Sequence, residues 1–158
     1  MTERDEFFMR KAIELAERVV ASNSGGPFGA IVVKDDEIIA EGYNSVTSLN
    51  DPTAHAEIIA IRKACQKLGS FQLEECTLYT SCEPCPMCLG AIYWARPKMV
   101  YYASGREDAA AIGFDDQFIY SELKKETAHR NIKFVRILRD HALKAFDKWK
   151  DKSNKIKY

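Results

Sequence analysis

The sequence carries no net charge, because its 158 residues include 23 basic and 23 acidic side chains. A protein that binds nucleic acid or an anionic membrane through its overall field needs an excess of positive charge, which this chain lacks. No apolar run approaches the roughly 20 residues of a membrane-spanning helix, and the opening MTERDEFFMR has no apolar signal-peptide core. We therefore expect a cytoplasmic protein that binds no membrane, and a nucleic acid partner is disfavoured.

The chain lacks an even number of cysteines, so its five copies cannot all pair within one chain. Cys82, Cys85 and Cys88 are spaced three residues apart around two prolines, which favours metal or redox chemistry over a disulfide framework. Cys65 and Cys76 stand alone in apolar surroundings, where a thiol usually behaves as a small core side chain. The cysteine pattern thus argues against a disulfide-stabilised secreted module.

Helical and extended patterns alternate along the chain. Apolar residues recur at helical spacing from Glu3 to Ala21, and two apolar runs on either side of Asp35 and Asp36 predict a hairpin. Further helices are expected near residues 54–69, 86–96, 115–125 and 141–150, and further strands at 76–80, 98–103 and 132–138. This order predicts one α/β domain over residues 1–158, a three-layer sandwich whose mixed five-stranded sheet has helices on both faces.

Two of these helices are expected to be mostly buried. The helix near 54–69 has only a narrow polar stripe, with Asp51 or Thr53 as its expected cap, and the segment Pro86–Ala95 carries no formal charge. His55 opens the first of these helices, while Cys85 falls at or near the N-cap of the second, just before Pro86. Functional side chains at two helix starts are therefore expected.

A catalytic zinc site takes three protein ligands, commonly imidazole and thiolate, and keeps a fourth position for water. His55 and the pair Cys85 and Cys88 supply three such ligands. Backbone N–H groups and the positive end of the helix dipole favour thiolates at the start of a helix. We therefore predict that these three residues bind zinc.

Glu57 supplies a carboxylate that can move protons beside the metal, provided that His55 lies at the very start of its helix. The runs HAE at 55–57 and PCPMC at 84–88 match the zinc deaminase signature H-x-E followed by P-C-x-x-C. Two alternatives stay open: a lone C-x-x-C also occurs in redox and structural zinc sites, and Cys82 as a fourth ligand would close the site to water. Cys82 lies up to roughly 10 Å back along the chain from Cys85, which disfavours it as a ligand.

Nearly the whole chain resembles the bacterial guanine deaminases of the cytidine deaminase superfamily. The resemblance rests on the segments GGPFGAIVVKD, DPTAHAEIIAIRKAC, LYTSCEPCPMCLGAIYWARP, GFDDQFIY and NKIKY. It implies the cytidine-deaminase-like sandwich, a Zn²⁺ cofactor and hydrolysis of the purine base guanine to xanthine and ammonia. It also implies a homodimer in which a C-terminal segment of about 141–158 is exchanged between subunits.

The resemblance further implies roles in catalysis and binding. Glu57 would accept a proton from water and pass it to the base, and Asp116 would assist the second proton delivery. Around the base the implied contacts are Phe28, Asn44, Ala56, Trp94, Phe114, Asp116 and Tyr158, the last from the partner subunit. Other roles stay open: Phe28 as plain core, Asn44 as a turn residue, and Asp115 or Asp116 as a helix cap.

Three other functions compete with this one. A tRNA adenosine deaminase shares the two motifs but needs a basic footprint for RNA, which a neutral chain does not favour. Deamination of guanosine or cytosine uses the same chemistry. A module in which zinc only stabilises the fold has no use for a proton shuttle at Glu57.

Overall fold

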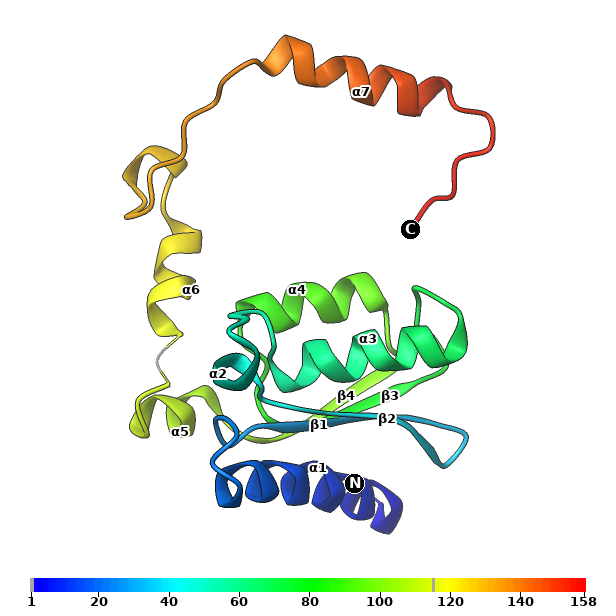
Figure 1. Ribbon diagram of the computed structural model, residues 1–158, viewed down its shortest axis with the longest axis vertical. Helices are drawn as coiled ribbons and strands as arrows, with labels where there is room; N and C mark the ends of the chain where they lie inside the picture. The colour runs from blue at the N-terminus through cyan, green and yellow to red at the C-terminus, as the bar shows by residue number, and fades with distance from the viewer. Residues whose placement is uncertain (1, 115) are drawn as a thin grey trace. The chain divides into compact units, whose positions relative to one another are not determined.

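The computed structural model of the chain describes residues 2–114 and 116–158 (Figure 1). These residues divide into two units, one up to Gln117 and one from Phe118 to Tyr158. The first unit contains, in chain order, α1 (Glu3–Ala21), β1 (Gly29–Lys34), β2 (Glu37–Tyr43), α2 (Val46–Leu49), α3 (Ala56–Leu68), β3 (Thr77–Cys82), α4 (Pro86–Ala95), β4 (Met99–Ser104) and α5 (Arg106–Ala111).

The first unit is built on a mixed sheet of four strands in the order β2-β1-β3-β4. β1 pairs antiparallel with β2 and with β3, while β3 pairs parallel with β4. Asp35 and Asp36 both have positive φ and form the tight turn between β1 and β2, so the predicted hairpin is confirmed. Because parallel strands need a crossover connection, α4 lies between β3 and β4 in the chain.

Helices cover both faces of this sheet, as predicted: α1 packs on one face, and α3 with α4 beside it covers the other (Figure 1). Successive side chains of a strand point to opposite faces. Accordingly, Ile31 and Val33 of β1 join the apolar cluster beneath α1, whereas Ala30 and Val32 join the cluster beneath α3. Each face of the central strands therefore has its own core.

α1 has the bounds that the sequence predicts, because both its cap and its apolar face are specified locally. The Thr2 backbone N–H donates to the Asp5 carboxylate at 3.0 Å, and the Asp5 N–H donates to the Thr2 hydroxyl. Hydrogen bonding to Thr2, aided by a 2.9 Å bond from the buried Tyr79 hydroxyl, lowers the pKa of Asp5. The residues of the apolar face are all buried: Phe8, Ala12, Leu15, Ala16 and Val19.

The starts of α3 and α4 position the functional side chains. His55 is the N-cap of α3 and Cys85 the N-cap of α4, with Pro86 at its first position. Asp51 and Thr53 do not cap α3 as expected. Asp51 instead accepts hydrogen bonds of 2.8 and 2.7 Å from the N–H and hydroxyl of Thr53 in the preceding turn.

Gly42 of β2 lets the first turn of α3 approach the sheet closely. A Cβ at this position would stand 2.1 Å from the carbonyl oxygen of Ala56 and 2.6 Å from the N of Ala60. No side chain fits at such distances. The lack of a side chain at Gly42 therefore determines how deeply Glu57 and its neighbours are seated.

The predicted fifth strand is wrong for the part of the chain that the structure describes. Residues 132–138 have no regular secondary structure, and the sheet has four strands. Alternating apolar residues gave this segment the pattern of a strand, but a strand forms only where a neighbour supplies its hydrogen bonds.

α4 is less buried than its lack of charge predicts. Cys88, Ile92 and Ala95 are buried, whereas Tyr93 and Trp94 are 74% and 63% exposed. The helix presents one stripe to the core, and its opposite side is apolar and exposed. A helix without charged side chains can therefore bury only one of its faces within its own unit and leave the other face exposed.

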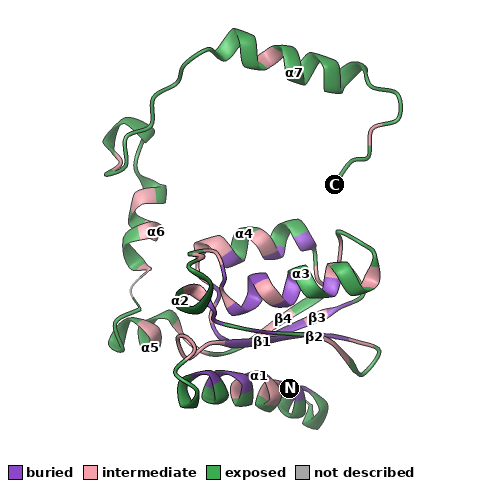
Figure 2. Ribbon diagram, viewed as in Figure 1, coloured by how far each residue is buried: buried purple, intermediate pink, exposed green. Residues whose placement is uncertain are grey.

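The second unit consists of helical segments whose apolar side chains are exposed. It includes α6 (Gln117–Lys124), whose first residue still belongs to the first unit, the 3₁₀ turn Thr127–His129 and α7 (Arg139–Asp151). None of the residues 118–158 is buried (Figure 2). Their large exposed apolar side chains are Phe118, Leu123, Ile132, Phe134, Val135, Ile137, Leu138, Phe146, Trp149, Ile156 and Tyr158. Among the described residues no helix is long and apolar enough to span a membrane.

Candidate metal centre and active site

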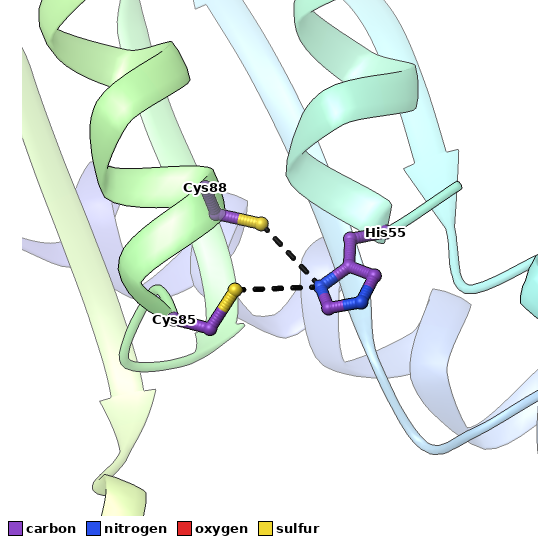
Figure 3. A group of neighbouring side chains, drawn as sticks. All are labelled: His55, Cys85 and Cys88. Carbon is purple, nitrogen blue, oxygen red and sulfur yellow. Dashed lines mark hydrogen bonds between the residues drawn. The ribbon is translucent and has the colours of Figure 1, made fainter. Parts of the chain in front are cut away.

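His55, Cys85 and Cys88 come together at the starts of α3 and α4 (Figure 3). Nδ1 of His55 lies 3.5 Å from Sγ of Cys85 and 3.5 Å from Sγ of Cys88. The possible ligand atoms of the three residues all lie within 4.8 Å of one another. With Zn–S near 2.3 Å and Zn–N near 2.0–2.1 Å, a sulfur and a nitrogen on one tetrahedral zinc stand about 3.5 Å apart. The triad thus fits the ligand spacing of zinc.

Hydrogen bonding and burial shift the pKa of each side chain in this triad. Hydrogen bonding to Cys88, helped by His55, holds the pKa of the Cys85 thiol well below its usual range. The hydrogen bond with Cys85 raises the pKa of His55, and sharing a hydrogen bond with Cys85 together with burial raises the pKa of Cys88. A metal ion that binds here therefore meets a thiolate at Cys85 and displaces the protons that His55 and Cys88 hold.

Glu57 lies beside the triad in the first turn of α3. Its side chain is buried, and Sγ of Cys88 donates to its Oε2 at 3.5 Å. Burial raises the pKa of Glu57 above the ordinary value of a carboxyl group. A carboxyl group with a raised pKa can both take up and return a proton near neutral pH, which suits a general base that later acts as an acid.

Cys82 lies at the end of β3 and is directed elsewhere. Its thiol donates to the carbonyl oxygen of Gly105 at 3.6 Å. Within the described part of the chain, the group that could hold a metal consists of His55, Cys85 and Cys88. Three ligands leave a tetrahedral ion one open position, as a catalytic site requires.

Three of the residues predicted to bind the base form a cluster of their own. The rings of Phe28 and Phe114 meet edge to face, with centroids 4.9 Å apart. The Asn44 N–H donates to the Phe28 carbonyl oxygen at 3.0 Å. Oδ1 of Asn44, a buried residue, accepts from the N–H groups of Gly26 at 3.2 Å and Val46 at 3.4 Å. Since its oxygen is occupied by backbone donors, Asn44 offers its NH₂ group as a donor.

The other predicted contacts have diverse surroundings. Ala56 is completely buried between His55 and Glu57 in the chain, and Trp94 is exposed on α4. Asp116 is half-buried, and its charge is one of the smaller influences that raise the pKa of His55, after the hydrogen bond with Cys85. Asp115, the other candidate cap, lies outside the described residues. Tyr158 belongs to the second unit and is 70% exposed.

Two glycines beside Asn44 were missed by the sequence reasoning. A Cβ on Gly25 would stand 2.0 Å from the Asn44 carbonyl oxygen, and Gly26 donates its N–H to the Asn44 side chain. Their only signal in the sequence is the pair of glycines before Pro27, which also marks the break after α1. These close contacts depend on Asn44, which follows Gly25 by 19 positions and Gly26 by 18, so the local pattern does not reveal them.

Comparison with known proteins gives the same class of site. The family described as "Cytidine and deoxycytidylate deaminase zinc-binding region" matches residues 2–104. The guanine deaminase of Bacillus subtilis (strain 168) is 57% identical over 153 residues, which cover 97% of this chain and 98% of that protein. The tRNA-specific adenosine deaminase of Aquifex aeolicus is 36% identical over 130 residues, 82% of each chain.

Solved structures agree with these relationships. The X-ray structure of guanine deaminase from Bacillus subtilis matches with a TM-score of 0.95 and 56% identity, covering 100% of this chain and 99% of that one. A guanine deaminase from Nitrosomonas europaea matches with a TM-score of 0.65 and 38% identity, over 69% of this chain and 63% of that one.

A buried carboxylate against a His-Cys-Cys triad, on this fold, defines a zinc-dependent deaminase. The chain belongs to the cytidine and deoxycytidylate deaminase family, and its predicted zinc cofactor is confirmed. Within that family it groups with the bacterial guanine deaminases, as its sequence segments predict.

Proposed function

We propose that this protein hydrolyses guanine to xanthine and ammonia. The observation that carries the proposal is 57% identity to a guanine deaminase over nearly the full length of both chains. The deaminases of tRNA adenosine are less similar and match a smaller part of the chain, for example 36% identity over 82%. The formal net charge of zero also favours a small base over RNA as the substrate.

In this proposal Nδ1 of His55 and the sulfurs of Cys85 and Cys88 hold zinc. Zinc in such a site supplies a Lewis acid that makes water nucleophilic near neutral pH. Cys82 is not one of the residues grouped around the metal position, and its thiol donates to the Gly105 carbonyl oxygen instead. Water and substrate therefore share an open site rather than a closed structural one.

Glu57 moves the protons. It takes one from the attacking water as the new bond forms to the carbon that bears the amino group, and it then protonates the neighbouring ring nitrogen. The remaining proton of the added hydroxyl then passes through Glu57, with help from Asp116, to the amino group, so that the C–N bond breaks, ammonia leaves and the carbonyl group of xanthine forms. The raised pKa of Glu57, caused by burial, suits both directions of transfer.

Recognition of the base uses the cluster around Asn44. The rings of Phe28 and Phe114 form a wall for the flat purine. The NH₂ group of Asn44 donates to an acceptor on the purine edge, while the carboxylate of Asp116 accepts from the N–H groups that distinguish guanine. Ala56 contributes to the site from the first turn of α3, between His55 and Glu57 in the chain, and Trp94 helps to close it.

We propose further that the protein is a cytoplasmic homodimer in which a C-terminal segment of about 141–158 is exchanged between subunits. Residues 1–158 form a single deaminase domain in this proposal. The support is the exposed apolar surface of the second unit, where Ile156 and Tyr158 are 68% and 70% exposed. Exposed apolar side chains on this scale mark an interaction surface. In the dimer the ring and hydroxyl of Tyr158 contact the base bound by the partner.

Deletion of residues 154–158 tests this role of the tail. We expect the kcat/KM for guanine to fall by at least about tenfold, because a ring and a hydroxyl that contact the base are lost. The zinc content should not change, since the ligands are the N-cap residues of α3 and α4 and a residue in the first turn of α4. Tyr158→Phe separates the two contributions, because it keeps the ring and removes the hydroxyl. Unaltered kinetics of the shortened protein would contradict the proposal.

A substrate panel tests the proposed reaction. Ammonia release is measured for guanine, guanosine, adenine, adenosine and cytosine, and we expect guanine to exceed the others by at least about tenfold in kcat/KM, since the donor and acceptor pattern must match the buried polar groups. Salt-sensitive binding of tRNA with deamination of its adenosine would instead show that the second candidate function is correct.

A further inference from the structure

Gly26 lies where three of the proposed base-binding residues meet. Its N–H donates to Oδ1 of Asn44 at 3.2 Å. A Cβ added at Gly26 would stand 2.9 Å from Cζ of Phe114 and 3.4 Å from Cδ2 of Phe28. The first of these distances is shorter than a carbon–carbon contact allows. The ring of Phe114 therefore occupies the space that a side chain at Gly26 would fill.

The backbone conformation does not explain this glycine. The described glycines with positive φ are Gly69 and Gly113, so Gly26 has a conformation that other residues also adopt. What glycine supplies here is the absence of a side chain, which allows the edge of the Phe114 ring to pack against the backbone.

We propose that Gly26 is a positioning residue of the purine pocket. The space beside its Cα sets the position of the Phe114 ring against Phe28, and its N–H holds the Asn44 amide with the NH₂ group toward the base. This inference rests on the proposed function, because it assigns Gly26 to the affinity for guanine. It does not involve the zinc or Glu57.

The two neighbouring glycines differ in what an added methyl group would meet. At Gly25 the Cβ would stand 2.0 Å from the Asn44 carbonyl oxygen, a backbone atom at the end of β2 that cannot move aside cheaply. At Gly26 it meets the far end of the Phe114 side chain, which is 43% exposed. Alanine at position 26 is therefore accommodated by a shift of the ring, so the pocket changes while the fold remains.

The first experiment measures the kinetics of Gly26→Ala with guanine. We expect KM to rise at least about tenfold and kcat to change less than about threefold. A displaced Phe114 ring weakens binding of the substrate in its ground state and in the transition state alike. Zinc content and thermal midpoint should match the wild type. Gly90→Ala is the matched control: its added Cβ meets no atom within 4 Å, so its kinetics should not change.

A double-mutant cycle then tests whether Gly26 acts through Phe114. Phe114→Leu shortens the side chain and leaves room for the added methyl group. If Gly26 positions this ring, Gly26→Ala combined with Phe114→Leu should be no worse than Phe114→Leu alone, a clear departure from additivity. The combined variant should also fold and bind zinc.

The outcomes separate this inference from the proposed function. Wild-type KM in Gly26→Ala, additive effects in the cycle, or failure of both Gly26→Ala variants to fold would each overturn the role of Gly26 and leave guanine deamination intact. A wild-type protein that releases no ammonia from guanine would overturn the proposed function and this inference with it.

Discussion

Glu57→Gln is expected to lower the rate of guanine deamination by roughly 10² to 10⁴-fold while zinc stays bound. Glutamine has nearly the same size as glutamate and can occupy the same buried place beside Cys88, where residue Glu57 is 6% exposed. It cannot accept a proton from water or return one to the ring. The effect should therefore appear in kcat, measured by ammonia release, with zinc measured on the same sample.

Glu75→Gln is the control for this change, because it makes the same substitution at an exposed position. Its activity should equal that of the wild type. Full activity of Glu57→Gln would rule out the proton shuttle. If the variant lost zinc in proportion to activity, Glu57 would support the metal site rather than move protons.

The metal triad was predictable because each of its parts is specified locally. A proline after Cys85 sets the start of α4, and a spacing of three residues puts Cys88 in the first turn of the same helix. His55 is distant in sequence, but its place at the start of α3 follows from the helical pattern after it. The pairing of the two helix starts followed from the zinc deaminase signature, H-x-E at 55–57 with P-C-x-x-C at 84–88, and needed no resemblance to a known family.

The predicted fifth strand failed because a strand depends on a non-local neighbour. The alternation of apolar and polar residues in 132–138 indicates which side chains could share one face of a strand. It does not indicate whether a second strand lies beside this segment to pair with it. The same limit applies to α4. Its lack of charge is a local fact, but the exposure of Tyr93 and Trp94 depends on what else packs there.

The cluster of Phe28, Asn44 and Phe114, which we propose binds the base, is a third kind of case. The resemblance identified Phe28, Asn44 and Phe114 as candidates, yet their arrangement comes from long-range contacts. Phe28 and Phe114 touch across 86 positions of sequence, and Gly26 reaches Asn44 across 18. No periodicity reports such contacts, so the direction of the Asn44 amide and the role of Gly26 came only from the structure.

Cys88→Ser is expected to remove zinc and nearly all activity. Loss of contacts that only support a ligand typically costs about 10 to 100-fold in metal affinity or activity, and loss of a ligand should cost more. Serine is nearly the same size, but its hydroxyl is not deprotonated near neutral pH and is a poor substitute for a thiolate. Because zinc binds the folded state, the thermal midpoint should fall as well and should no longer depend on added zinc.

Cys82→Ser makes the same exchange of sulfur for oxygen three residues before Cys85, and its comparison with Cys88→Ser decides the nature of the site. Both thiols are buried, but that of Cys82 is directed to the Gly105 carbonyl oxygen, an acceptor that a serine hydroxyl can also use. Cys82→Ser should therefore keep its zinc and its guanine turnover. Equal loss of zinc in both variants would mean that Cys82 is a fourth ligand, and a site closed by four protein ligands would leave no position for water.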